Sequence, residues 1–189
     1  MAYATYTTEA LVCGSRDNNT SDRAFLLFTK EAGMLWASAR SVREERSKQR
    51  FALQDFSLIR VSLVRGKSGW RIGSAECLDN FYTLAPDRET RGAVTRVLRL
   101  VRQFVHGEEP QPRLFAEVQE VLPRIAGGAV AASLAADVAT LRMLYVLGYV
   151  QKTPSLTAYL ESAWPTCLKP LTEEAEKAIE QAFSVSHLG

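Results

Sequence analysis

The stretch from residue 58 to residue 77, LIRVSLVRGKSGWRIGSAEC, carries the clearest strand pattern in the chain. Apolar side chains recur at every second position from Ile59 to Leu63, and the residues between them face the opposite side of an extended chain. The sequence Gly-Lys-Ser-Gly at 66–69 predicts a hairpin turn, and residues 70–77 predict the returning strand. This stretch therefore predicts two antiparallel strands with one face turned toward a core.

Three more strands are expected before this hairpin. Residues 23–29 contain a continuous apolar run, which is typical of a strand buried on both faces. After Gly33, residues 35–39 alternate between two faces, and residues 11–13 lie in a segment rich in Thr, Tyr and Val. The stretch 41–50 has no period and predicts a long exposed loop. Five short strands in about 75 residues predict a small closed barrel of the OB type, and an SH3-like barrel with a similar strand count is the alternative.

Beyond Pro86 the apolar residues follow the period of a helix. The expected helices lie at 94–105, at 114–125, at 134–145 and from the capping residue Thr172 onward. The third of them is apolar on nearly all sides, which predicts a central place in a bundle. The predicted fold class is therefore α+β, with a five-stranded OB-type barrel in residues 1–80 and an all-α helical domain in residues 81–189. The boundary is expected between Asn80 and Arg88.

Composition and cysteine usage exclude several classes of protein. The chain is 47% hydrophobic and 23% charged, which is typical of a globular protein and not of a disordered one. It has no apolar run of about 18 residues, so no membrane-spanning helix is expected, and its first nine residues do not resemble a signal peptide. Cys13, Cys77 and Cys167 are far apart and odd in number, which predicts a reduced, cytoplasmic protein without a disulfide framework. Neither His106 nor His187 has a metal-ligand spacing with a cysteine, so we expect no metal and no other cofactor.

The sequence also lacks the motifs of common enzyme classes. Neither a nucleophile elbow nor a dinucleotide-binding glycine motif occurs. Residues 66–68 resemble the end of a phosphate-binding loop, but the earlier glycine is missing and the context is strand–turn–strand. We therefore expect no enzymatic activity and no small-molecule substrate.

The formal net charge of +2 hides a local basic region. The stretch from Arg40 to Arg71 contains nine basic and three acidic residues, so the rest of the chain is net acidic. A basic region on an acidic body indicates a polyanion as ligand, and the alternative is a solvated loop that keeps the protein soluble. The candidate phosphate contacts are the basic residues of this stretch: Arg40, Arg43, Arg46, Lys48, Arg50, Arg60, Arg65, Lys67 and Arg71.

Two tryptophans accompany these cations. Trp36 is expected on the outward face of its strand with Ser38 and Arg40, and Trp70 directly precedes Arg71. OB barrels bind single strands by contacting phosphates through Lys and Arg, while bases stack on aromatic side chains for about 1–3 kcal/mol per base. The alternative is that both indoles fill the barrel or contact the helical domain. The cations would contact phosphate and would not read the base sequence.

Several segments of the chain resemble the RecO family of recombination mediators. They are TEALV at 8–12, RD at 16–17, SDR at 21–23, LFTKE at 27–31, LQDFSL at 53–58, LF at 114–115, LR at 141–142, LGY at 147–149 and AIEQAF at 178–183. Together they are distributed over most of the chain, in the right order.

The resemblance implies an OB barrel followed by a helical domain, without enzymatic turnover. It also implies binding of single- and double-stranded DNA, annealing of complementary strands, binding of SSB and, with RecR, help in loading RecA on SSB-coated DNA. Such a protein is expected in the cytoplasm, associated with the nucleoid. Many members carry a four-cysteine zinc module after the segment matching 147–149. Residues 150–166 contain no cysteine here, so the resemblance is to a short form and no metal is carried over.

The resemblance further suggests that the acidic, apolar C-terminal tail of SSB docks on the helical domain, where Arg102, Arg113 and Arg142 are the candidate residues. Arg142 interrupts an otherwise apolar helix, and the alternative for it is an ion pair with Glu117 or Glu120. A second hypothesis is a non-enzymatic adaptor whose barrel binds proteins and not DNA. The two hypotheses differ in salt response, because phosphate binding weakens steeply with salt.

Overall fold

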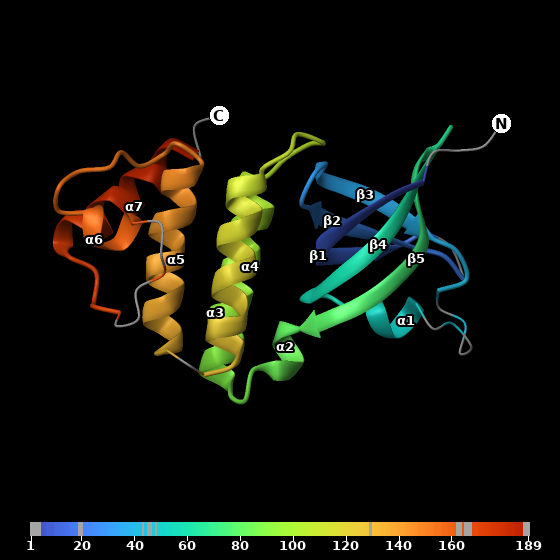
Figure 1. Cartoon of the computed structure of the whole chain (residues 1–189), viewed down its shortest axis with the longest axis horizontal. Coiled ribbons are helices and arrows are strands. Elements are labelled where there is room, and N and C mark those ends of the chain that lie inside the picture. Colours follow the sequence, from blue (N-terminus) through green and yellow to red (C-terminus); the bar gives the residue numbers. More distant parts are fainter. Residues whose placement is uncertain are drawn as a thin grey trace. The chain divides into compact units, whose positions relative to one another are not determined.

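The computed structural model (Figure 1) describes residues 5–18, 21–42, 44, 47, 49–128, 130–161, 164 and 168–186. By its internal contacts the chain divides into two compact units. We call residues 1–84 with 101–112 the barrel unit, and residues 85–100 with 113–189 the helical unit. The segment 101–112 thus belongs to the barrel unit by its contacts, although it follows the start of the helical unit in sequence.

Five strands close into a barrel in the order β1-β2-β3-β5-β4 (Figure 1). They are β1 (Thr5–Asp17), β2 (Arg23–Thr29), β3 (Gly33–Ala39), β4 (Ser57–Gly66) and β5 (Gly69–Asn80). Neighbouring strands are antiparallel except β3 and β5, which run parallel. Gly66 pairs with Gly69 at the predicted hairpin. The predicted α+β fold class, a five-stranded barrel followed by helices, is confirmed.

The barrel core is filled from alternate positions of the strands. The predicted inward residues from Ile59 to Leu63 are buried, and Phe25 and Leu27 of β2 pack with them. Ala24 and Phe28 on the other face of β2 are buried as well. The prediction that β2 is buried on both faces is therefore confirmed.

The connection between β3 and β4 is not the uniformly exposed loop that its sequence predicts. Gln49–Ala52 form the one-turn helix α1, and Val42 is 2% exposed and belongs to the barrel core together with Leu53. The prediction of an exposed loop over 41–50 is wrong at Val42, which is buried, and at Gln49 and Arg50, which are helical. An apolar side chain can join a core without any periodic pattern around it. The predicted phosphate contacts Arg43, Arg46 and Lys48 lie outside the described residues.

The later helices are α2 (Phe81–Leu84), α3 (Arg88–Phe104), α4 (Pro112–Ala126), α5 (Ala132–Val146), α6 (Thr157–Leu160) and α7 (Glu173–Ser186). The longer ones, α3, α4, α5 and α7, correspond to the predicted helices, whereas a single turn such as α2 or α6 shows no period. Residues on all sides of α5 are buried, and α5 packs against α6 and α7, which confirms its predicted central place (Figure 1). In the described part of the chain, none of the helices has the length and apolar character needed to cross a membrane.

The two ends of α3 are fixed by hydrogen bonds. At its start, Oδ1 of Asp87 accepts a hydrogen bond from the backbone N–H of Thr90 at 2.8 Å, and hydrogen bonding to Thr90 lowers the pKa of Asp87. Beyond its end, the carbonyl of Gly107 accepts a hydrogen bond from the N–H of Met34 at 2.9 Å. This bond ties the segment after α3 to the start of β3.

Cys13 provides a chemical test of the barrel. It lies at a bulge of β1, where the register with β2 shifts between Val12 and Gly14, and burial raises the pKa of its thiol to about 12. Because the thiolate is the reactive form, we expect Cys13 to resist iodoacetamide at pH 8 until the chain unfolds, whereas the exposed Cys77 reacts in the folded state. Peptide mass spectrometry after timed labelling measures both rates.

A variant with both Cys77→Ser and Cys167→Ser leaves Cys13 as the single thiol for this measurement. Labelling of Cys13 in the folded chain at the rate of a free thiol would contradict the buried placement. The raised pKa also means that the unfolded chain releases this proton first, so Cys13 lowers stability as the pH rises from 9.0 to about 12.

Candidate nucleic-acid interface

The outward face of β3 presents an aromatic side chain, a hydroxyl and a cation in succession. Trp36 is 39% exposed, Ser38 is half-buried and Arg40 is exposed, as the alternation in the sequence predicts. The parallel neighbour β5 places Trp70 and Arg71 beside the C-terminal part of β3, and the Ser38 hydroxyl donates a hydrogen bond to the Trp70 carbonyl at 3.4 Å. We call the group Trp36, Ser38, Arg40, Trp70 and Arg71 the β3–β5 track.

Both tryptophans of the track line one hollow in the barrel unit. Arg102 near the end of α3 and His106 after it line the same hollow. Trp70 is half-buried against the barrel core, and its Nε1–H is buried without a hydrogen-bond partner among the described residues. Trp36 is thus the more exposed of the two indoles, whereas Trp70 also packs against the barrel core, which is the alternative stated for it.

A guanidinium group lies over each indole. The Arg16 Cζ is 4.3 Å from the ring centroid of Trp36, and the Arg65 Cζ is 4.9 Å from that of Trp70. Arg65 also forms an ion pair with Glu108. Arg16 is absent from the residues predicted from sequence, because only the pairing of β1 with β2 and of β2 with β3 brings it to this face.

Two arginines of the track line a second hollow further along β3. Arg40 and Arg71 share it with Ser38 and Gln49, and the Gln49 side-chain amide donates a hydrogen bond to the carbonyl of Gly73 at 2.9 Å. Among the described residues, no carboxylate lies within ion-pair distance of either arginine. An exposed aromatic ring and two cations without a carboxylate partner in the described part of the chain therefore follow one another along the same pair of strands.

Apart from Arg65, the other predicted phosphate contacts that the structure describes do not belong to this track. Arg60 forms an ion pair with Glu76 at 3.0 Å, across from β4 to β5. The Arg50 Cζ lies 5.2 Å from the ring centroid of Phe51, and Lys67 is exposed at the tip of the β4–β5 hairpin. The described cations of the basic stretch thus fall into two groups, Arg40, Arg65 and Arg71 at the track and Arg50, Arg60 and Lys67 elsewhere on the barrel unit.

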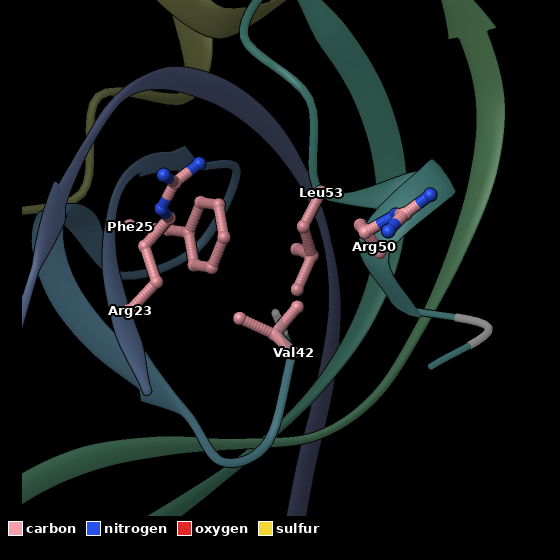
Figure 2. Close-up of a pocket in the computed structure, with 5 residues that line it drawn as sticks. All are labelled: Arg23, Phe25, Val42, Arg50 and Leu53. Atoms are coloured by element: carbon pink, nitrogen blue, oxygen red, sulfur yellow. The ribbon is translucent and has the colours of Figure 1, made fainter. Parts of the chain in front are cut away.

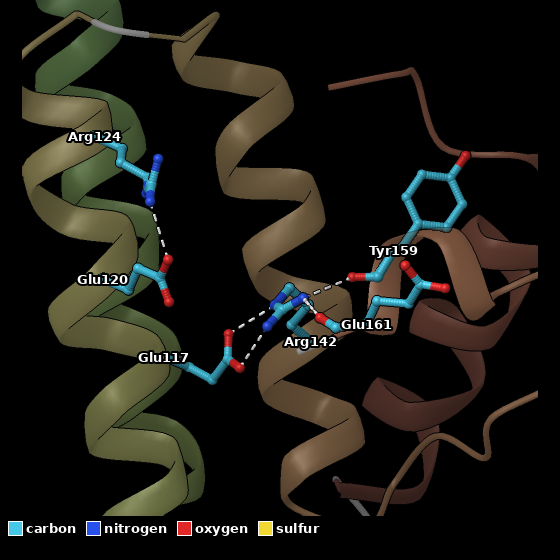
Figure 3. Close-up of polar contacts among 6 residues, drawn as sticks. All are labelled: Glu117, Glu120, Arg124, Arg142, Tyr159 and Glu161. Atoms are coloured by element: carbon cyan, nitrogen blue, oxygen red, sulfur yellow. Dashed lines mark hydrogen bonds and ion pairs between the residues drawn. The ribbon is translucent and has the colours of Figure 1, made fainter. Parts of the chain in front are cut away.

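In the helical unit, Arg142 of α5 is almost buried, with 4% of its side chain exposed. Its Nε and Nη2 donate hydrogen bonds to the two carboxylate oxygens of Glu117 on α4, both at 2.7 Å. Its Nη1 donates to the carbonyl oxygens of Tyr159 and Glu161, at 3.0 and 2.5 Å (Figure 3). All three guanidinium nitrogens are thus engaged, and Arg142 joins α4 and α5 to the end of α6.

The geometry of Arg142 matches the ion-pair alternative and selects its partner. Glu117 is that partner, because Glu120 is paired with Arg124 at 3.0 Å (Figure 3). A cation that binds an incoming acidic tail directly needs free donors, and the nitrogens of Arg142 are already hydrogen-bonded. Arg142 therefore stabilises the packing of α4, α5 and α6, and its charge is not available to an incoming acidic tail.

The candidate tail-binding arginines fall into two places. Arg113 and Arg142 line one hollow of the helical unit with Tyr145 and Leu160, and Arg113 is its exposed cation. Arg102 belongs to the barrel unit, where it lines the hollow of the two tryptophans. The structure thus groups two of the three predicted residues and separates the third.

Metal binding finds no support in the part of the chain that the structure describes. There, no three His, Cys, Asp or Glu side chains lie close enough together to hold a metal ion. Cys167 lies outside the described residues.

Comparisons with known proteins identify relatives of both units. A family model described as Recombination protein O N terminal matches residues 1–81, and one described as Recombination protein O C terminal matches residues 85–153. The chain is 35% identical over 123 residues to the DNA repair protein RecO of Myxococcus xanthus, which covers 64% of this chain and 50% of the relative. It is 31% identical over 144 residues to the protein of the same name from Pelotomaculum thermopropionicum, which covers 76% and 56%.

A third relative, the DNA repair protein RecO of Clostridium novyi, is 26% identical over 144 residues, with the same coverage of 76% and 56%. The chain spans about half the length of the curated relatives it matches. The matched regions include both the β3–β5 track and the helices that hold Arg142.

Proposed function

Because the chain belongs to the RecO family, we propose that it acts in DNA repair and recombination as a non-enzymatic protein that binds DNA through its barrel unit. The observation that carries this proposal is the β3–β5 track, where an exposed indole and two guanidinium groups without a carboxylate partner among the described residues follow one another. The names of the relatives, DNA repair protein RecO, support the same process.

The two hollows of the track supply the two interactions that an unpaired strand needs. Bases stack on the exposed ring of Trp36, and the phosphates of the same strand contact Arg40 and Arg71. Side chains with base-reading geometry are not required, so binding is independent of base sequence. Charge neutralisation is the whole mechanism of this step, because each contacted phosphate releases its condensed counterions.

Annealing and partner binding extend this proposal. Neutralised phosphates on two complementary strands repel each other less, which favours their pairing. The hollow lined by Arg113, Tyr145 and Leu160 combines a cation with apolar surface, which suits the acidic, apolar tail of SSB. With RecR, the protein would then help RecA load on SSB-coated single-stranded DNA, and it would also bind double-stranded DNA in the nucleoid.

Binding of a fluorescent oligothymidine, followed by anisotropy from about 50 to 300 mM salt, tests DNA binding. We expect a log–log slope of about −3 or steeper for the unchanged chain. Replacing both Arg40 and Arg71 by Glu is expected to weaken binding at least about tenfold and to flatten the slope by about 1.4, since each phosphate contact contributes about 0.7 on a single strand.

The matched control replaces Arg60 and Lys177 by Glu, which changes the net charge equally. Both of these cations are already paired with carboxylates, Glu76 and Glu173, so a small effect is expected. Equal losses in the two double variants would show that the track is not the site. Absence of binding by the unchanged chain at low salt would overturn the proposal in favour of a protein-binding adaptor.

A further inference from the structure

A pocket of about 210 Å³ lies in the barrel unit between the start of β2, the residue Val42 after β3, and the segment that contains Arg50 and Leu53 (Figure 2). Three buried apolar side chains, Phe25, Val42 and Leu53, form its inner surface. Arg23 and Arg50 line the same pocket from two different segments. The pocket is therefore apolar inside with a cation on either side.

The two arginines are available to a ligand. Arg23 donates from Nε to Asp17 Oδ1 at 2.9 Å, its charge also acts on the carboxylate of Asp55, and its side chain remains 39% exposed. Figure 2 shows the guanidinium of Arg50 directed away from the three apolar side chains. An occupant would thus meet apolar surface with its inner part and positive charge with its outer part.

The pocket adjoins the β3–β5 track through the chain itself. Gln49 lines the hollow that contains Arg40 and Arg71, and the next residue, Arg50, lines the pocket. On the other side of the connection, Arg40 lines that hollow and Val42, two residues later, lines the pocket. Neighbouring residues of the chain thus line the hollow of the track and the pocket.

We propose that this pocket receives one unstacked nucleobase of a single DNA strand lying on the track, with the neighbouring phosphates held by Arg23 and Arg50. The proposal rests on the proposed function. An apolar cavity of about 150 Å³ holds one benzene molecule, so a pocket of about 210 Å³ has room for one base. A phosphate stays outside, because an apolar surface cannot replace its hydration, whereas a guanidinium binds it bidentately.

Moving a base from a single strand into the pocket also requires little free energy. A base in a single strand has no pairing partner to lose, so its extrusion requires less free energy than from a duplex. An apolar peptide end with a free carboxylate would match the same charges, but its path would not need the adjoining track. The continuity of pocket and track therefore favours a nucleotide.

Oligothymidines with a single 2-aminopurine provide the test, because the fluorescence of this base rises when it leaves a stack. We expect the unchanged chain to raise the fluorescence at one position of the bound strand. Leu53→Phe fills the pocket and should abolish this rise and weaken binding about tenfold, the equivalent of one lost base contact. Leu53→Met keeps the volume and should preserve both.

A second pair of variants changes charged residues at the edge of the pocket and leaves the apolar core residues unchanged. Arg23→Gln should reduce the fluorescence rise and the affinity, whereas Asp17→Asn breaks the same exposed ion pair and should reduce neither. This pair decides the question if Leu53→Phe does not fold, which circular dichroism reveals.

Two further results would overturn the inference while the proposed function stands. The first is DNA binding that weakens in Trp36→Ala but is unchanged, in affinity and fluorescence, in Leu53→Phe and Arg23→Gln. The second is loss of the fluorescence rise on adding N-acetylphenylalanine but not on adding dAMP, which would assign the pocket to a peptide end. Absence of any DNA binding would overturn the proposed function and this inference together.

Discussion

Replacing Arg142 by methionine is expected to destabilise the helical unit by about 3–5 kcal/mol. The variant removes the partner of Glu117, whose side chain is 18% exposed, and leaves a carboxylate with little access to water. It also removes the hydrogen bonds that the carbonyls of Tyr159 and Glu161 accept. Urea denaturation followed by far-UV circular dichroism measures the change in the free energy of unfolding.

Two companion variants make this result specific. Arg124→Met removes an exposed ion pair with Glu120 within α4 and should cost about 0.3–0.5 kcal/mol. The double variant Arg142→Met with Glu117→Leu leaves no unpaired charge and should recover part of the lost stability. A change below about 0.5 kcal/mol for Arg142→Met alone would show that the charge pair does not hold the segment after α6 in place.

Gly33→Ala is expected to destabilise the barrel unit by about 3 kcal/mol or more. Gly33 has a φ of +65°, which an L-residue adopts at a cost of about 1–2 kcal/mol. A Cβ at this position would also lie 2.7 Å from the backbone nitrogen of Glu109 and closer still to its carbonyl oxygen. Since backbone atoms cannot rotate away, the segment after α3 would have to move, which disturbs the hydrogen bond between Met34 and Gly107.

Gly107→Ala is the matched control for this steric effect. Gly107 has a φ of +75°, and a Cβ there would meet nothing within 4 Å. Its replacement should cost about 1–2 kcal/mol, which is the cost of the left-handed backbone conformation without a steric clash. Thermal unfolding of both variants separates the two effects, and equal losses would mean that the contact between Gly33 and Glu109 contributes nothing.

Local periodicity was sufficient to predict most of the fold. The alternation from Ile59 to Leu63 and the outward placement of Trp36, Ser38 and Arg40 follow from the two-residue repeat of a strand. The helices α3, α4 and α7 show their 3.6-residue repeat in the same way, whereas α5 is marked by its length and by apolar residues on nearly all sides. One-turn helices and the buried Val42 carry no repeat, so their sequence does not distinguish them from a loop.

The candidate site depends on contacts between distant parts of the chain, which periodicity does not contain. Arg71 stands beside Ser38 because β3 and β5 pair in parallel, and Arg16 reaches Trp36 through the pairing of three strands. Sequence reasoning narrowed the partner of Arg142 to two acids one helical turn apart. The choice between them required the positions of α4 and α5.

The parallel junction of β3 and β5 also has a thermodynamic consequence. It joins the strands at two paired positions, Ala37 with Trp70 and Ser38 with Arg71, whereas the junctions of β4 with β1 and β5 extend over most of their lengths. The barrel therefore opens most easily at this seam. A ligand that contacts both strands binds the closed barrel better than the opened one, so by linkage it stabilises the closed form. A ligand on the track would thus stabilise the β3–β5 junction, which is the junction of the barrel that opens most easily.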